Sequence, residues 1–140
     1  MSIVNEQKHV FPRRILHTML RVRDIEKSER FYCQLLGMTL QRKKEYPDGE
    51  FTLAFLGYGD ESNHTVLELT HNWSEQTYTK GNAYGHIALA VSDIYATCLY
   101  LEQQAVQITR PPGPMKADVS EIIAFIKDPD GYQIELIEKN

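Results

Sequence analysis

Apolar and polar residues alternate in ILHTMLRV (15–22), the first of eight short stretches that have the length and composition of β-strands. Alternation of this kind is typical of β-strands that bury one face. Turn residues separate most of the stretches, so a sheet-rich fold is indicated. The predicted strands span residues 15–22, 38–46, 51–58, 64–70, 84–91, 106–110, 122–127 and 132–138.

Two other stretches carry the three-to-four-residue spacing of amphipathic helices. The first spans 25–36 and follows Asp24, whose carboxylate is a good N-cap. The second follows Ser92 or Asp93, either of which can serve as the cap, and ends near Gln104. Each predicted helix therefore comes directly after the first strand of its half of the chain.

Glycine and proline mark the ends and turns of these elements. Gly37 is expected to end the first helix. The segments 47–49 and 128–131 have turn composition, the second as a hairpin, and the proline-rich stretch 111–121 is expected to be a loop.

The order of elements is β-α-β-β-β, and it occurs twice. We therefore expect an α+β fold of two tandem modules: module one at 13–72 and module two at 83–140. Residues 73–82 form a polar linker between the modules, and residues 1–12 form an N-terminal extension. With 140 residues, the two modules fit within a single domain with curved mixed sheets.

Composition narrows the possible functions. The net charge of −4 disfavours nucleic acid as a main partner, because phosphate binding requires a basic surface. No apolar run reaches the length of a membrane span, and the first residues lack the pattern of a secretory signal. Cys33 and Cys98 have no framework spacing and are expected to be free thiols in the cytoplasm.

One histidine and one glutamate occupy matching places in the two modules. His17 opens HTMLRVRDI and His86 opens HIALAVSDI, while Glu68 lies in VLELT and Glu135 in QIELIE. Phe55 and Phe125 also recur at nearly equal distances from the two histidines. A repeated unit with one imidazole and one carboxylate suggests a metal centre with two of each.

A simpler interpretation of each residue stands beside this one. A single histidine early in a strand is usually a surface or hydrogen-bonded residue, and a glutamate in VLELT can lie on a solvated strand face. Burial of an unpaired carboxylate among leucines is costly, which favours a bound partner for Glu68. If the first and last strands of each module lie together, His17 can meet Glu68, and two modules set face to face would join all four side chains.

These stretches resemble a known family. HTMLRVRDIEKSERFYCQLLGM, LAFLGYGDE, LELTHNW, YGHIALAV and AFIKDPDGYQIELIE are similar to the compact bacterial type of glyoxalase I (lactoylglutathione lyase), in the vicinal-oxygen-chelate superfamily. The resemblance runs from Ile15 to Glu138. It implies that His17, Glu68, His86 and Glu135 hold one divalent metal, and that each site of a homodimer takes one pair from each subunit.

The resemblance also implies a reaction. Members of the family isomerise the hemithioacetal of methylglyoxal and glutathione to S-lactoylglutathione, which detoxifies methylglyoxal. A divalent ion stabilises the enediolate, and a glutamate moves the proton. We expect Glu135 to be the main base, with Glu68 as the second catalytic carboxylate across the metal. Two nitrogen and two oxygen ligands favour Ni²⁺, with Co²⁺ or Mn²⁺ possible and Zn²⁺ less favoured.

Four residues match the contacts that the family makes to glutathione, the expected co-substrate. Arg21 shares a strand face with His17 and suits a carboxylate, and Asn72 follows the Glu68 strand. Arg110 and Lys116 flank the proline-rich loop, where they can equally be solvated charges. At the place where some relatives carry an arginine, this chain has Asn82.

Three other functions share the scaffold. An acyl-CoA epimerase would have glutamine in place of Glu68, and an Fe(II) dioxygenase would hold its metal with two histidines and one carboxylate. A metal-free small-molecule-binding module would lack the paired ligands. The intact set of four favours the isomerase.

Overall fold

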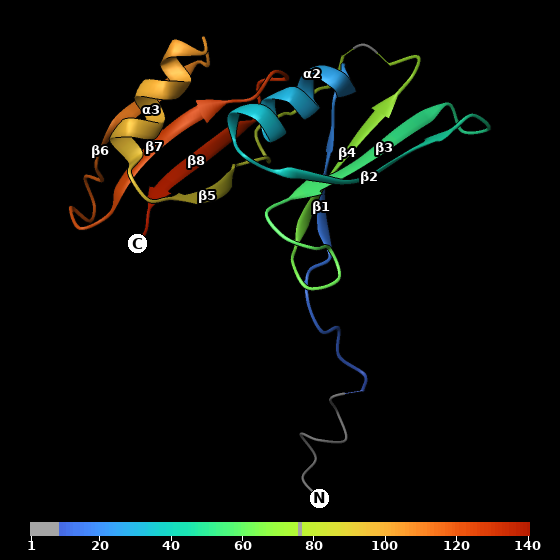
Figure 1. Ribbon diagram of the computed structural model, residues 1–140, viewed down its shortest axis with the longest axis horizontal. Helices are drawn as coiled ribbons and strands as arrows, with labels where there is room; N and C mark the ends of the chain where they lie inside the picture. Colours follow the sequence, from blue (N-terminus) through green and yellow to red (C-terminus); the bar gives the residue numbers. More distant parts are fainter. Residues whose placement is uncertain (1–8, 76) are drawn as a thin grey trace, which may run out of the picture.

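The computed structural model describes residues 9–75 and 77–140, so most of the predicted N-terminal extension lies outside the described residues. The predicted double β-α-β-β-β order is confirmed (Figure 1). None of the helices in these residues is long and apolar enough to cross a membrane.

Module one is a four-stranded mixed sheet in the order β1-β4-β3-β2. Its strands are β1 (His17–Arg21), β2 (Thr39–Tyr46), β3 (Phe51–Gly57) and β4 (Val66–Asn72). The first and last strands, β1 and β4, pair in parallel, and the other neighbours are antiparallel. This pairing confirms the condition under which His17 and Glu68 can meet.

Module two repeats this topology in the order β5-β8-β7-β6. Its strands are β5 (Ile87–Val91), β6 (Ile108–Pro114), β7 (Ile122–Lys127) and β8 (Gln133–Glu138). Strands β5 and β8 pair in parallel, as β1 and β4 do. The two sheets lie side by side in Figure 1, and one helical segment runs along each of them.

The first helical segment differs from the prediction of one α-helix over 25–36. Helix α2 (Ile25–Glu29) is capped by Asp24 as predicted and then widens into the π-helix η1 (Arg30–Leu35). Phe31 and Tyr32 are consecutive and both buried. Because a π turn holds more residues, it turns successive side chains through a smaller angle, which lets both rings face the core.

The second helix, α3 (Ile94–Gln103), ends where the sequence predicted. Its N-cap is Asp93, whose carboxylate accepts a hydrogen bond from the backbone N–H of Ala96 at 3.1 Å. This contact decides between the two caps that the sequence left open.

The hydrophobic core lies between the helices and one face of each sheet. In β4, Leu67 and Leu69 are buried with the aromatic rings of η1, and in β8, Ile134 and Leu136 are buried with α3 residues. The alternate residues of the same strands, among them Glu68 and Glu135, point to the other face. The helices therefore leave the glutamate face of each sheet uncovered.

The prediction that 111–121 is entirely loop was wrong at its start. Strand β6 runs through Pro111, Pro112 and Pro114, with register shifts on its pairing to β7. β6 is an edge strand with one neighbour, so a proline need not cost a ladder hydrogen bond.

Candidate metal centre

His17 and Glu68 form a close pair on the uncovered face of module one. Strand register puts Glu68 opposite Met19, two residues along from His17, so both side chains share one face. Nε2 of His17 lies 2.9 Å from Oε1 of Glu68. The second carboxylate oxygen accepts a hydrogen bond from Oγ1 of Thr70 at 3.0 Å, which fixes the carboxylate plane.

His86 and Glu135 form the equivalent pair in module two. His86 directly precedes β5. Glu135 lies in β8 and pairs with Ala88 of β5. Nε2 of His86 lies 3.1 Å from Oε1 of Glu135. The repeat seen in the sequence thus becomes a repeat in three-dimensional geometry.

A phenylalanine packs against each of these histidines. The rings of His17 and Phe55 are 5.4 Å apart at 78°, and those of His86 and Phe125 are 5.3 Å apart at 77°. These edge-to-face contacts hold each imidazole in place and cover one side of it with apolar surface. The side chains of the glutamates are only 15% and 14% exposed, so each carboxylate has little water around it.

The two pairs do not meet within one chain. Among residues 9–75 and 77–140, no three His, Cys, Asp or Glu side chains lie close enough to hold a metal together. Two cavities of about 500 and 550 Å³ open beside α2, and none of the four paired residues lines either of them. Each module therefore presents half of the predicted ligand set, on a face that the helices of the described chain do not cover.

Arg21 is the last residue of β1 and Asn72 is the last residue of β4. Tyr78 of the linker lies near both. Arg21 lines a cavity of about 160 Å³ together with Tyr78 and Lys80. Asn72 donates a hydrogen bond from Nδ2 to the Tyr78 hydroxyl at 3.3 Å. The structure thus brings two of the four predicted thiol-binding residues into one neighbourhood, at the end of the strands that hold His17 and Glu68.

The Arg110 side chain is bonded to the backbone and is not a solvated charge. Its guanidinium donates to the carbonyls of Pro111, Gly113, Pro114 and Ile123 at 2.8–2.9 Å. These hydrogen bonds pin the proline-containing half of β6. Lys116 lies beyond β6 and is exposed. None of these contacts joins Arg110 to either His–Glu pair.

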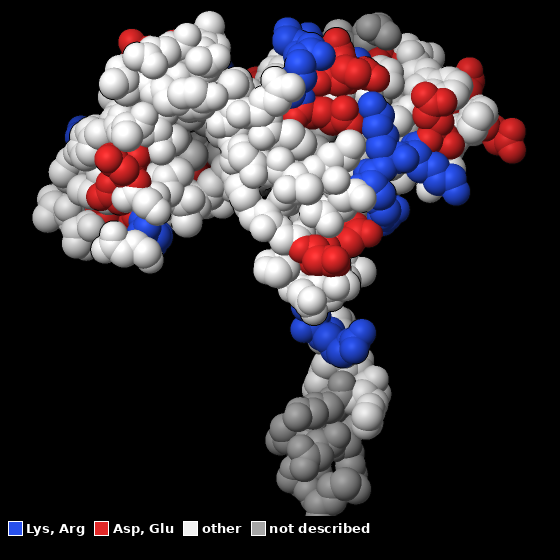
Figure 2. All heavy atoms as spheres, in the orientation of Figure 1, with Lys and Arg blue, Asp and Glu red and all other residues white. Residues whose placement is uncertain are grey.

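Charges of both signs are interspersed over the β2 side of module one, and much of the rest of the face shown in Figure 2 is uncharged. Lys43 lies between Glu26 and Glu29 at 3.4 and 3.2 Å, and these contacts raise its pKa against the opposing effect of burial. Arg42, its neighbour, faces the other way and is paired with Glu61 at 2.7 Å.

A model of the Glyoxalase/Bleomycin resistance protein/Dioxygenase superfamily matches residues 14–136. The chain belongs to this glyoxalase superfamily. The match covers both modules and all four paired residues, and it confirms the resemblance seen in the sequence.

Curated relatives and solved structures agree with this assignment. A Synechocystis sp. protein named probable lactoylglutathione lyase is 58% identical over 89% of this chain and 94% of its own length. A Neisseria meningitidis protein named lactoylglutathione lyase is 57% identical over 90% of this chain and 91% of its own length.

Two glyoxalase I structures share the fold. The maize enzyme superposes with a TM-score of 0.86 at 40% identity over 90% of this chain, which spans only 44% of the longer maize chain. The Leishmania major enzyme, described as trypanothione-dependent, gives a TM-score of 0.81 at 42% identity, with 91% of this chain and 87% of that chain covered.

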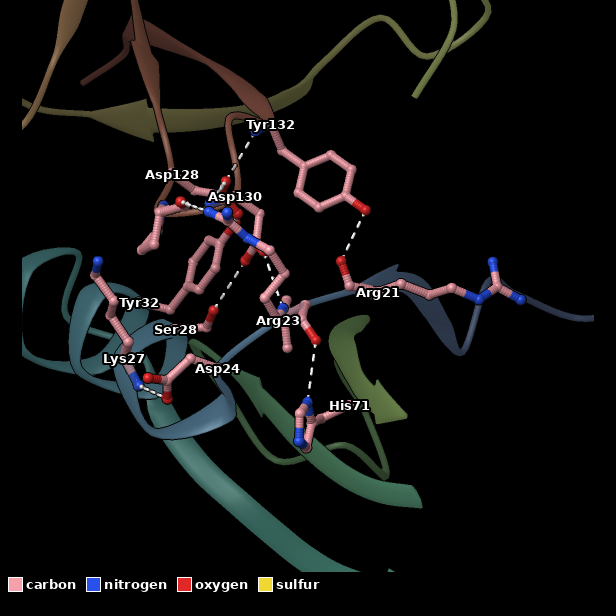
Figure 3. A network of polar contacts seen from close by, with 12 residues as sticks. Arg21, Arg23, Asp24, Lys27, Ser28, Tyr32, His71, Asp128, Asp130 and Tyr132 are labelled. Atoms are coloured by element: carbon pink, nitrogen blue, oxygen red, sulfur yellow. Dashed lines mark hydrogen bonds and ion pairs between the residues drawn. The ribbon is translucent and has the colours of Figure 1, made fainter. Parts of the chain in front are cut away.

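Sequence reasoning missed the contact between the modules of this glyoxalase-family chain. The turn after β7 packs against module one, as Figure 3 shows. Asp128, only 5% exposed, accepts a 2.6 Å hydrogen bond from the Tyr32 hydroxyl of η1. Burial raises the pKa of Asp128, although the donors Tyr32, Tyr132 and Asp130 oppose the shift. Burial and the neighbouring Asp128 also raise the pKa of Tyr32.

The same turn holds the end of β1. The backbone N–H and Nε of Arg23 donate to Oδ1 of Asp130 at 2.9 and 3.1 Å. The Tyr132 hydroxyl donates to the carbonyl of Arg21 at 2.8 Å (Figure 3). Module two therefore fixes the backbone from which Arg21 projects. The sequence identified the turn but gave no sign of what it contacts.

Proposed function

We propose that this chain is a lactoylglutathione lyase that acts as a homodimer. Each active site takes the His17–Glu68 pair from one copy and the His86–Glu135 pair from the other. The proposed reaction isomerises the hemithioacetal of methylglyoxal and glutathione to S-lactoylglutathione. The observation that carries the proposal is the duplicated His–Glu pair, in a chain 52–59% identical to proteins with that name.

The half-sites support a shared centre. Each pair points to a sheet face that its own chain does not cover, and each has a nitrogen and an oxygen donor already in contact. A two-fold dimer can place unlike modules of two copies opposite each other, which builds two equal sites. Such a dimer would remove the partly exposed histidines from water.

The donors fit a divalent ion. Two imidazole nitrogens and two carboxylate oxygens, with no thiolate, match metals of intermediate hardness and leave further positions open for substrate. We therefore propose Ni²⁺ as the preferred metal, with Co²⁺ or Mn²⁺ as substitutes and Zn²⁺ less effective. When bound, the metal would supply Lewis-acid stabilisation of the negative charge that develops on the substrate oxygens, worth roughly several kcal/mol.

The side chains supply the rest of the chemistry. We assign Glu135 as the base that removes the proton from C1 of the hemithioacetal and returns it to C2, and such a transfer is worth about 10²–10⁴-fold. Glu68 lies across the site, where its second oxygen is occupied by Thr70. That bond holds the Glu68 carboxylate in one orientation. Among the described residues, the Glu135 carboxylate has His86 as its partner and no equivalent hydroxyl donor.

Thiol binding falls to the basic and amide side chains around the pairs. We propose that Arg21, Asn72 and Lys116 contact glutathione. Arg110 would contribute by fixing the shape of β6, because its guanidinium is already bonded to four carbonyls. Glutathione is the expected thiol, and the free thiols Cys33 and Cys98 fit a cytoplasmic setting.

The proposal is tested with metal-depleted protein reloaded with Ni²⁺, Co²⁺, Mn²⁺ or Zn²⁺. Formation of the thioester from methylglyoxal and glutathione is followed by its absorbance, and metal content is measured in parallel. We expect turnover with nickel and little with zinc. A protein that binds no metal, or that forms no thioester with any of the four ions, would refute the proposed function.

A single substitution tests the assignment of the base. Glu135→Gln should abolish nearly all turnover, because an amide cannot take up the proton, while light scattering still shows a dimer. His64→Gln is the matched control, since the His64 side chain is exposed and its Nδ1 lies 3.3 Å from the carbonyl oxygen of Asp60, in a turn that includes neither His–Glu pair. Unchanged turnover of Glu135→Gln would show that another group is the base.

A further inference from the structure

Arg42 lies beside the metal-binding half of module one. Its guanidinium carbon is 3.7 Å from the centre of the Phe55 ring. The same ring packs edge-to-face against His17 at 5.4 Å. The cation therefore stands one aromatic ring away from a proposed metal ligand, on the face where substrate would bind.

A bulge in β2 puts Arg42 on that face. Leu40 pairs with Leu56 and Arg42 pairs with Phe55. Between these pairs β2 advances by two residues and β3 by one, so β2 contains one extra residue. The extra residue changes which side chains point to which face. The cation–π contact with the Phe55 ring then holds the guanidinium over that ring.

Among the described residues, one nitrogen of the Arg42 side chain has a hydrogen-bond partner. Nε donates to Oε1 of Glu61 at 2.7 Å, which orients the group. The two terminal nitrogens make no hydrogen bond within residues 9–75 and 77–140, and the side chain is 52% exposed. A guanidinium that is held by a ring on one face and by a carboxylate at Nε, with both terminal nitrogens exposed, suits a bidentate contact to a second carboxylate.

Module two shows what the equivalent arginine does when it has a structural role. Arg110 follows a register shift in β6 and stands opposite Phe125, as Arg42 stands opposite Phe55. Its fork, however, is bonded to four backbone carbonyls. Of the two repeat-related arginines, Arg42 is the one whose terminal nitrogens have no partner in the described part of the chain.

We propose that Arg42 is a substrate-binding residue that holds a carboxylate of the thiol substrate beside His17. The inference rests on the proposed function and extends it to a residue that the sequence gave no reason to select. The thiol tripeptide has two carboxylates, and a chain of net charge −4 needs local cations to receive them.

The test is calorimetric binding of S-methylglutathione, an unreactive thioether, to the nickel-loaded dimer. Arg42→Gln should weaken binding about tenfold, the lower range for a hydrogen-bonded charge pair because the site is half exposed. The affinity of Arg42→Lys should lie between those of the wild type and Arg42→Gln, because lysine keeps the charge and lacks the paired nitrogens of the guanidinium. In turnover, the KM of the hemithioacetal should rise while kcat stays within about twofold.

Two controls separate binding from structure. Lys44→Gln removes a positive charge two residues along β2 and should bind like the wild type. Glu61→Gln removes the charge that orients Arg42, and it should lower the ligand affinity less than Arg42→Gln does. If Glu61→Gln reproduces the whole loss, Arg42 acts through the 58–65 loop and the proposal is overturned.

Two ligand analogues identify the carboxylate. S-methylglutathione glycyl ethyl ester lacks the glycyl charge, and S-methyl-N-acetylcysteinylglycine lacks the γ-glutamyl carboxylate. For the analogue that lacks the carboxylate bound by Arg42, Arg42→Gln should change the affinity little. For the analogue that keeps this carboxylate, Arg42→Gln should lower the affinity about as much as it does for S-methylglutathione. An equal loss for all three ligands, or no loss for any, would overturn the proposal. If the wild-type dimer neither binds these ligands nor forms thioester, the proposed function itself fails.

Discussion

At the scale of single residues, His17, Glu68, His86 and Glu135 could be selected from the sequence because a histidine and a glutamate occupy matching places in both modules. Arg42 could not, since it lies in the basic run RKK, which has the composition of a solvated strand. The bulge before it decides its direction, and no residue of the run marks the bulge. Asp128 was identified only as part of a turn, because its partner Tyr32 is 96 residues away.

The buried Asp128 gives a prediction about pH. Because burial raises its pKa, the folded protein holds the Asp128 proton to higher pH than the unfolded chain does. Stability therefore falls as pH rises from the ordinary Asp value through the raised pKa, and is flat above it. Relative to Asp128→Asn, wild-type protein should lose unfolding free energy over that window, measured by urea denaturation of metal-free protein.

Asp118→Asn provides a control of opposite sign. The hydrogen bonds from Ser120 lower the pKa of Asp118, so its contribution is present above the ordinary Asp pKa and is lost as pH falls. A difference between wild type and Asp128→Asn that does not change between acid and neutral pH would contradict the account of Asp128.

At the scale of elements, the strands, turns and helix caps could be predicted. They follow from the pattern of apolar residues, from the glycines at turns and from the aspartates before the helices. The π-helix and the length of β6 were not, because both depend on tertiary contacts. Consecutive burial of Phe31 and Tyr32 goes with the wider helix. In β6, the side chain of one arginine bonds to backbone that proline composition alone assigns to a loop.

Arg110→Gln should therefore loosen the proline-containing half of β6. We expect a loss of about 1–2 kcal/mol in unfolding free energy, since the substitution leaves carbonyls without their charged donor. Amide hydrogen exchange in 113–123 should speed up. Lys116→Gln, on the exposed loop beyond β6, should change neither quantity. An Arg110→Gln protein with wild-type stability and exchange would show that the four hydrogen bonds do not hold the strand.

At the scale of the whole molecule, the sequence predicted two modules but left open how the four ligands are brought together. Spacing along a chain does not determine how two modules are oriented. The orientation is set by contacts such as those of Tyr32 with Asp128 and Tyr132 with Arg21, between residues that the sequence pattern does not connect. These contacts hold the sheets side by side, so the two His–Glu pairs stay apart in one chain. The proposed four-ligand centre therefore needs a second copy of the chain.

Subunit mixing tests this claim most directly. One variant carries His17→Ala and Glu68→Ala, the other carries His86→Ala and Glu135→Ala, and each alone should be inactive and unable to hold the metal tightly. After unfolding and refolding together with nickel, half of the dimers are mixed, and each mixed dimer has one complete site. We predict a return of thioester formation and bound nickel to about a quarter of the wild-type level, as random pairing in a two-fold dimer requires. If the mixture stays inactive and metal-free while mass spectrometry shows mixed dimers, the ligands do not come from two chains.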